Sequence, residues 1–119
     1  MKYVCLVHFD GAVLDALDHA GKHRLDVDSV GYDEELKAGG HLIAAEALQA
    51  PQSAVLVRVR DGRLSATDGP FIETKEQLGG FILIEARDMN EAIRLAAGIP
   101  LARLGTIEVR PIYDIPVRK

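Results

Sequence analysis

The first strand-like segment of the chain, Lys2–Phe9, carries apolar side chains on both of its faces. Because successive side chains of a strand point to opposite faces, Val4 and Leu6 share one face, and the other face holds Tyr3, Cys5, Val7 and Phe9. A chain of 119 residues is expected to form a single domain over residues 1–119, and its helices can cover only one face of its sheet. We therefore expect the other face to pack against a second copy of the chain.

Further strand signals, bounded by glycine, proline or aspartate, occur in five segments: His41–Leu48, Ala54–Arg60, Arg63–Thr67, Gly80–Ala86 and Thr106–Tyr113. Asp61-Gly62 separates two of these segments and favours a two-residue turn with positive φ. The sequence therefore predicts a β-hairpin over Ala54–Thr67.

Two helices are expected between the strands. One begins after Asp88, because this aspartate can cap a helix and Glu91 lies three residues further on, as in a capping box. Apolar residues then repeat at helical spacing up to Gly98, namely Met89, Ala92, Ile93, Ala96 and Ala97. The other helix is expected over about residues 28–38, with Leu25, Tyr32 and Leu36 on one face.

The order of these elements is β-α-β, a hairpin, and β-α-β. This order is typical of a ferredoxin-like α+β fold with an antiparallel sheet and helices on one face.

Composition excludes some partners. The 18 acidic and 14 basic residues give a formal charge of −4 with the signs interspersed, which disfavours nucleic-acid binding. No apolar stretch approaches the length of a membrane span, and the N-terminal apolar run is too short for a signal peptide. The single cysteine, Cys5, cannot form an intramolecular disulfide and is expected to be a buried thiol. We expect a cytoplasmic protein with neither nucleic acid nor membrane as a partner.

The segment Thr67–Phe81, TDGPFIETKEQLGGF, resembles the signature of the DGPF, or YCII-related, protein family. Gly40-His41-Leu42, the Val59–Gly62 turn and Ile107–Ile112 support the resemblance. It implies a dimeric ferredoxin-like fold, assembled like a dimeric α/β barrel, in a family whose biochemical role is largely unassigned. Members of the DGPF branch resemble proteins found beside, or fused to, alternative sigma factors, which implies a regulatory accessory role.

Some YCII-related proteins carry a histidine in the first helix and an aspartate near the second, proposed as a catalytic pair. Counted back from Gly40, the histidine would fall near Ser29, and the aspartate near Gly98. Neither position holds the required side chain, and an unassisted serine hydroxyl cannot replace an imidazole base.

The Asp68-Gly69-Pro70-Phe71 motif has two interpretations. As a tight turn, which we prefer, aspartate bonds nearby backbone amides, glycine admits unusual dihedrals and proline fixes φ. As a site, Asp68 would be a catalytic acid or base at a pocket mouth, Phe71 would pack on a ligand, and Glu73 and Lys75 would contribute charge.

His8 is expected on the same sheet face as Glu108 and Arg110, with Glu46 on a neighbouring strand. A Glu–Arg cross-strand pair explains these polar side chains, but a pocket between the sheet and a partner could use Glu46 and Arg110 to bind a ligand. Histidine ordinarily titrates near neutral pH, so His8 is the preferred catalytic candidate.

His19 and His23 would share a helix face, but Gly21 between them argues against a helix, and we expect no metal. Nucleotide-binding glycine loops are absent from the sequence, and no cofactor is expected. The first hypothesis is a homodimer that binds a small molecule. The alternatives are a cofactor-independent isomerase, lyase or hydrolase that uses His8 or Asp68, and a purely structural or protein-interaction dimer.

Overall fold

The computed structural model describes residues 1–69 and 76–117. The main sheet has the strand order β2-β5-β1-β6 and consists of β1 (Lys2–Asp10), β2 (Leu42–Ala47), β5 (Glu76–Glu85) and β6 (Thr106–Pro111). A separate two-stranded sheet contains β3 (Val55–Arg60) and β4 (Arg63–Asp68). The helices are α1 (Gly11–Asp15), α2 (His19–Ala38) and α3 (Met89–Ala97), with 3-10 turns at Pro51–Ser53 and Pro100–Arg103. Neighbouring strands run antiparallel, which confirms the predicted α+β class with a hairpin between two βαβ units.

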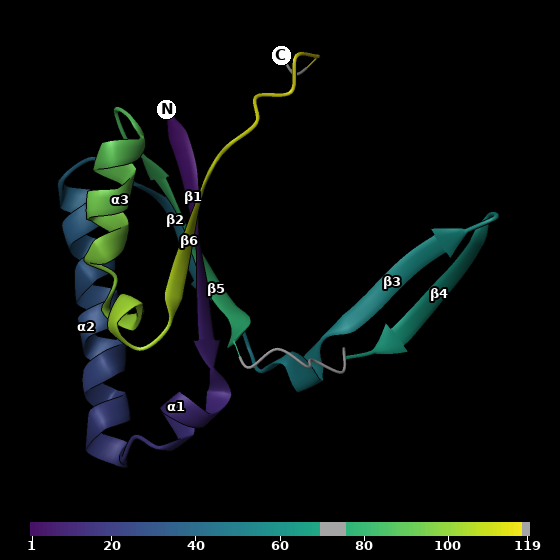
Figure 1. Cartoon of the computed structure of the whole chain (residues 1–119), viewed down its shortest axis with the longest axis horizontal. Coiled ribbons are helices and arrows are strands. Elements are labelled where there is room, and N and C mark those ends of the chain that lie inside the picture. The colour runs from purple at the N-terminus through teal and green to yellow at the C-terminus, as the bar shows by residue number, and fades with distance from the viewer. Residues whose placement is uncertain (70–75, 118–119) are drawn as a thin grey trace.

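Helices α2 and α3 lie on one side of the main sheet (Figure 1). The core between them and the sheet consists of Tyr3, Cys5, Val7, Leu36, Ile82, Ile84, Ala86, Ala92, Ala96 and Ile99. The Tyr32 hydroxyl donates a hydrogen bond of 2.6 Å to the Leu95 carbonyl and so joins α2 to α3. The core therefore occupies only the helix-facing side of the sheet among the described residues.

The opposite side, here called the open face, has no helix over it in the part of the chain that the structure describes (Figure 1). Strand register places on it Val4, Leu6, His8, Glu46, Phe81, Leu83, Glu108 and Arg110. The predicted apolar second face of β1 is therefore present. Its covering by a second copy stays a prediction.

Helix α3 begins as predicted. The Asp88 side chain accepts a hydrogen bond of 2.9 Å from the Glu91 amide, and the Glu91 carboxylate accepts one of 2.9 Å from the Arg87 amide. The buried residues Ala92 and Ala96 lie at the middle of the helix face that packs on the core, and Leu95 beside them also contacts the core. Ile93, which was expected on this face, is 52% exposed because it lies about 100° round the helix from Ala92.

Helix α2 is longer than predicted, because it begins at His19 and includes Gly21. Gly21 therefore does not exclude a helix here, and that prediction was wrong. Gly21 is the third helical residue, and its amide donates a hydrogen bond of 2.7 Å to the capping side chain of Asp18. The predicted face of Leu25, Tyr32 and Leu36 does turn toward the sheet. Neither α2 nor another helix of the described segments combines the length and apolarity needed to cross a membrane.

The predicted hairpin is confirmed. Asp61 and Gly62 have φ values of 52° and 74°, as a two-residue primed turn requires. We call Val55–Asp68 the arm, because it extends away from the main sheet (Figure 1). The radius of gyration of 16.4 Å reflects this extension, since a compact chain of this length would have about 13.5 Å.

Cys5 is 1% exposed, and burial raises the pKa of its thiol to about 11. The thiol is therefore protonated at neutral pH and is a packing group rather than a nucleophile.

We expect Gly98→Ala to destabilise the fold by about 1–3 kcal/mol, the usual cost of overpacking. A Cβ at Gly98 would overlap the Tyr32 phenol, which must then leave its bond to Leu95. The control is Gly31→Ala in α2, where a Cβ meets nothing within 4 Å, and helix propensity predicts a gain of about 0.5–1 kcal/mol. Urea denaturation measures both changes, and equal stability of the two variants would contradict this account of the α2–α3 contact.

Candidate functional site

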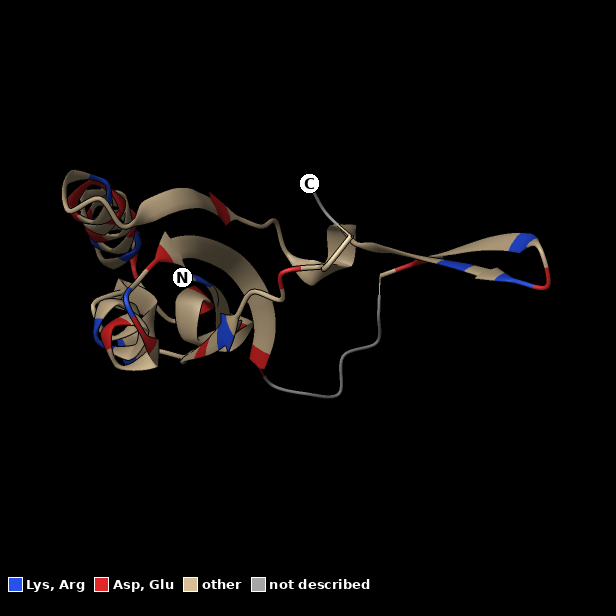
Figure 2. Cartoon of the chain, turned by 90° about the horizontal axis from the view of Figure 1, so that it is seen from above, with Lys and Arg blue, Asp and Glu red and all other residues tan. Residues whose placement is uncertain are grey.

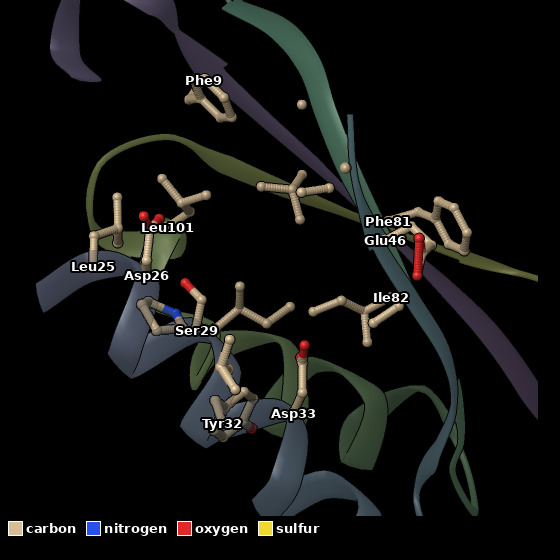
Figure 3. Close-up of a pocket in the computed structure, with 18 of the residues that line it drawn as sticks. Phe9, Leu25, Asp26, Ser29, Tyr32, Asp33, Glu46, Phe81, Ile82 and Leu101 are labelled. Atoms are coloured by element: carbon tan, nitrogen blue, oxygen red, sulfur yellow. The ribbon is translucent and has the colours of Figure 1, made fainter. Parts of the chain in front are cut away.

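A cavity of about 470 Å³ lies between α2 and the helix-facing side of the sheet (Figure 3). Its apolar walls come from β1, β5, α2 and the segment after α3, and include Val7, Phe9, Leu25, Ile82, Ile99 and Leu101. The C-terminal part of α2 is anchored by the buried Leu36, whereas its earlier turns stand over the cavity. The space therefore lies where α2 does not pack tightly on the sheet.

A β-bulge in β5 shapes the floor of this cavity. Val7 pairs with Gly80 and His8 pairs with Leu78, so Gly79 is the extra residue between them. A Cβ at Gly79 would overlap the ring of Phe9, and a Cβ at Gly80 would lie 2.9 Å from the Glu46 carbonyl oxygen. Glycines at both positions let the aromatic ring and the neighbouring strand approach the floor.

The polar side of the cavity comes from one face of α2. Lys22, Asp26, Ser29 and Asp33 recur at intervals of three or four residues and line the cavity together. Ser29 and Asp33 point from the helix into the space, opposite Ile82 (Figure 3). This arrangement can hold an organic molecule with its apolar body against the sheet and its polar groups against α2.

The carboxyl group of Asp33 has a raised pKa. Partial burial is the larger cause, because it disfavours the charged form, and the negative charge of Glu34 adds to it. Ionisation of Asp33 therefore lowers the stability of the folded protein. A ligand that donates a hydrogen bond to this carboxylate, or that carries positive charge, would offset that loss.

The open face carries a second polar group of side chains. Nε2 of His8 lies 3.0 Å from Oε1 of Glu108, and Nε of Arg110 lies 3.8 Å from Oε2 of the same carboxylate. Leu6 pairs with Glu108 and Val4 with Arg110, so strand register alone brings these side chains together. Glu108 can fix the orientation of the imidazole and leave Nδ1 free to accept a proton. His8, Glu108 and Arg110 thus lie together on the open face, but the expected Glu–Arg cross-strand pair is not what joins them. Glu108 and Arg110 belong to the same strand, β6, and the contact that crosses strands is the one between His8 and Glu108.

Glu46 does not join this cluster. It pairs with Phe81, and β5 and β1 lie between it and the strand that carries Glu108. Three strand spacings of about 4.8 Å separate the two carboxylates across the sheet. Glu46 therefore lies at the β2 border of the cavity, and its side chain shares the open face with Phe81.

Asp68 ends β4, in the other sheet from His8, so the structure does not bring the two catalytic candidates together. Among the described residues its side chain has no hydrogen-bond partner. Glycine was expected at position 69 for its dihedral freedom, but the structure gives a different reason. A Cβ there would lie 2.7 Å from the Pro51 carbonyl oxygen, so a larger residue would not fit. Phe71 of this motif, and Glu73 and Lys75 that follow it, lie outside the described residues.

His19 and His23 share the first turns of α2, since this segment is helical. Within residues 1–69 and 76–117, no group of three or more histidine, cysteine or acidic side chains is arranged to hold a metal.

The cavity was not predicted from the sequence. Ser29 was noted only as the position where related chains carry a histidine, and it proves to line the cavity. The Gly79-Gly80 pair was a usable signal, because adjacent glycines within a strand indicate a bulge or a close approach.

Comparisons with known proteins identify a family from the sequence and a similar fold among solved structures. The profile of the YCII-related domain matches residues 1–116. An uncharacterized protein, R00369, of Rhizobium meliloti (strain 1021) is 32% identical over 114 residues, which cover 94% of this chain and 92% of that protein. The fold is similar to that of 5-chloro-2-hydroxyhydroquinone dehydrochlorinase (TftG) from Burkholderia phenoliruptrix AC1100, solved in complex with 2,5-dihydroxybenzoquinone. That match has a TM-score of 0.58 and 15% identity, and covers 95% of this chain and 94% of the other.

We expect Asp33→Asn to raise the melting temperature at pH 7. A pKa raised in the folded state means that folding favours the protonated form, so the ionised carboxylate costs stability at neutral pH. The gain should fade as the pH falls below the ordinary value of 3.8, where Asp33 is protonated in both states. Asp28→Asn on the exposed side of the same helix is the charge-matched control. A gain that persisted unchanged at pH 3 would contradict the electrostatic cause.

Proposed function

The chain belongs to the YCII-related family, and from that premise we propose that it forms a homodimer that binds a small organic molecule between α2 and the sheet. The observation that carries the proposal is the cavity of about 470 Å³. Ligand pockets commonly have volumes of about 300–1,000 Å³, with apolar walls and a few polar groups that fix orientation. Here the polar groups converge from one face of α2.

The position of the cavity supports binding more than proton transfer. The resemblance placed the family's proposed catalytic histidine near Ser29 and its aspartate near Gly98. Ser29 lines the cavity, and Gly98 packs against Tyr32, which also lines it. The chain thus keeps a pocket at these positions without the imidazole that would act as a base. Binding without turnover is what a regulatory accessory role would require, and the link to an alternative sigma factor rests on the family resemblance.

The ligand class that we propose is a single-ring aromatic compound with hydroxyl groups. Phe9, Ile82 and Leu101 offer an apolar surface to a ring, while Ser29 and Asp33 can accept hydrogen bonds from hydroxyl groups. The TftG structure holds a quinone of this size, which makes hydroxylated benzenes the first compounds to screen.

The homodimer in this proposal rests on the open face. Val4, Leu6 and Leu83 are only partly exposed, yet they belong to a sheet face without a helix over it among the described residues. Packing this face against its copy would remove apolar area from water on both chains and would close a two-fold interface.

The alternative is a cofactor-independent isomerase, lyase or hydrolase, and the contact of 3.0 Å between His8 and Glu108 favours it. A general base needs an oriented imidazole with one free nitrogen, which this pair can provide. In this alternative, compounds that bind should be converted, and His8→Gln should lower turnover by about 100-fold or more while the melting temperature stays close to that of the parent. Chromatography of the incubated compounds measures turnover, and full activity of the variant would exclude His8 as the base.

For the binding proposal we expect a thermal-shift screen of hydroxylated aromatic compounds to give hits, because a ligand of the folded state raises its stability. Ser29→Phe should abolish the shift by filling the cavity. Val27→Phe adds the same side chain on the same helix at a position that is already 53% exposed, and it should leave the shift intact. Hits that bind Ser29→Phe as well as the parent would remove the cavity as the site.

A further inference from the structure

The arm exposes its side chains on both faces. Every residue of β3 and β4 is exposed, and within the described residues these strands pair only with each other. An isolated two-stranded hairpin is marginally stable in water, and an open ribbon edge is a template for pairing with another chain. The arm is therefore a structure that needs a partner surface.

Strand register divides the arm into two different faces. Residues paired across the hairpin share a face, so one face, the arm's apolar face, carries Val55, Val57, Val59, Leu64 and Ala66, with Asp68 at its base. The opposite face carries Leu56, Arg58, Arg60, Arg63, Ser65 and Thr67. Val57 is 63% exposed and Leu64 is 71% exposed. An apolar stripe backed by a basic one is the pattern of a ribbon that packs on a surface.

We propose that the arm's apolar face packs on a second copy of this chain, so that each protomer clasps the other. This inference rests on the proposed homodimer. Figures 1 and 2 show α2 and α3 on one side of the main sheet and the arm extending from the other side. A second copy seated on the open face therefore lies beside the arm.

The area that a stable dimer needs supports the same occupant. The four strands have 9, 6, 10 and 6 residues. At about 3.3 Å per residue and about 4.8 Å between strands, they give the open face an outline of about 500 Å². A stable interface buries about 800 Å² on each partner. The arm's apolar face adds an outline of about 200 Å², so it supplies a large part of what the sheet face lacks.

Charge favours a second copy as well. The arm holds three arginines, Arg58, Arg60 and Arg63, against two aspartates, Asp61 and Asp68. The 14 basic and 18 acidic residues of the chain leave 11 basic and 16 acidic residues outside the arm. The arm is thus net positive by one and the rest of the chain net negative by five, and opposite charges steer the arm toward the body of its partner.

The test compares an aspartate on each face of the arm. Val57→Asp places a carboxylate on the arm's apolar face, and Ser65→Asp places one on the opposite face beside Arg58. Sedimentation equilibrium of the full chain gives the dimer dissociation constant. We expect Val57→Asp to raise it by about tenfold or more, because a carboxylate must be desolvated, and Ser65→Asp to change it by less than about threefold.

Val57→Thr keeps a β-branched side chain and should give an intermediate rise, which decides the matter if the aspartate variant does not fold. Leu6→Asp on the open face separates the two proposals. Dissociation by Leu6→Asp with no effect of the Val57 variants would overturn the clasp and leave the dimer. A parent chain that is monomeric at millimolar concentration would overturn both the dimer and the clasp. If Val57→Asp lowers the melting temperature but leaves the dissociation constant unchanged, the arm packs on its own chain and the clasp is overturned.

Discussion

The pairing of β1 with β5 determines both the core and the cavity. At one end of the pair Tyr3, Cys5 and Ile84 are almost fully buried under α2 and α3. At the other end the bulge at Gly79 interrupts the ladder, and the ring of Phe9 takes the space that a side chain at Gly79 would fill. The same two strands therefore support a tightly packed core at one end and the floor of the cavity at the other.

Helix α2 follows this division. Leu36, near its C-terminal end, is buried, and Tyr32 is tied to α3 through the Leu95 carbonyl. The helix also presents Asp26, Ser29 and Asp33 to the cavity, where apolar residues would stabilise the fold more. A helix face that sacrifices packing in this way is expected at a binding site, because function there competes with stability.

Local signals explain which parts of the fold the sequence predicted. The Asp61-Gly62 turn and the Asp88 cap each depend on a few adjacent residues, and strand alternation placed His8 and Glu108 on one face. The start of α2 was missed because Gly21 was judged by its average helix propensity, although at the third helical position its amide is bound by Asp18.

The cavity lay beyond sequence reasoning for a different reason. It depends on how far the early turns of α2 stand from the sheet, which no pattern within α2 encodes. The arm illustrates the same limit, because the hairpin was predictable from its turn, whereas its projection to the side opposite α2 and α3 depends on the chain at its base (Figure 1). There, Gly69 approaches the Pro51 carbonyl so closely that a side chain would not fit.

The cavity and the proposed dimer surface share one strand. Val7 lines the cavity and His8, the next residue, faces the open side, because side chains alternate along β1. The bulge at Gly79 forms the cavity floor, and directly beside it Leu78 pairs with His8. A ligand that moves Phe9 or Gly79 therefore also displaces their chain neighbours His8 and Leu78, and His8 lies on the open face. A sheet is a single layer of backbone, and interiors transmit strain because they are close-packed. Occupancy of the cavity and association through the open face are therefore expected to influence each other's free energy, with equal coupling in both directions.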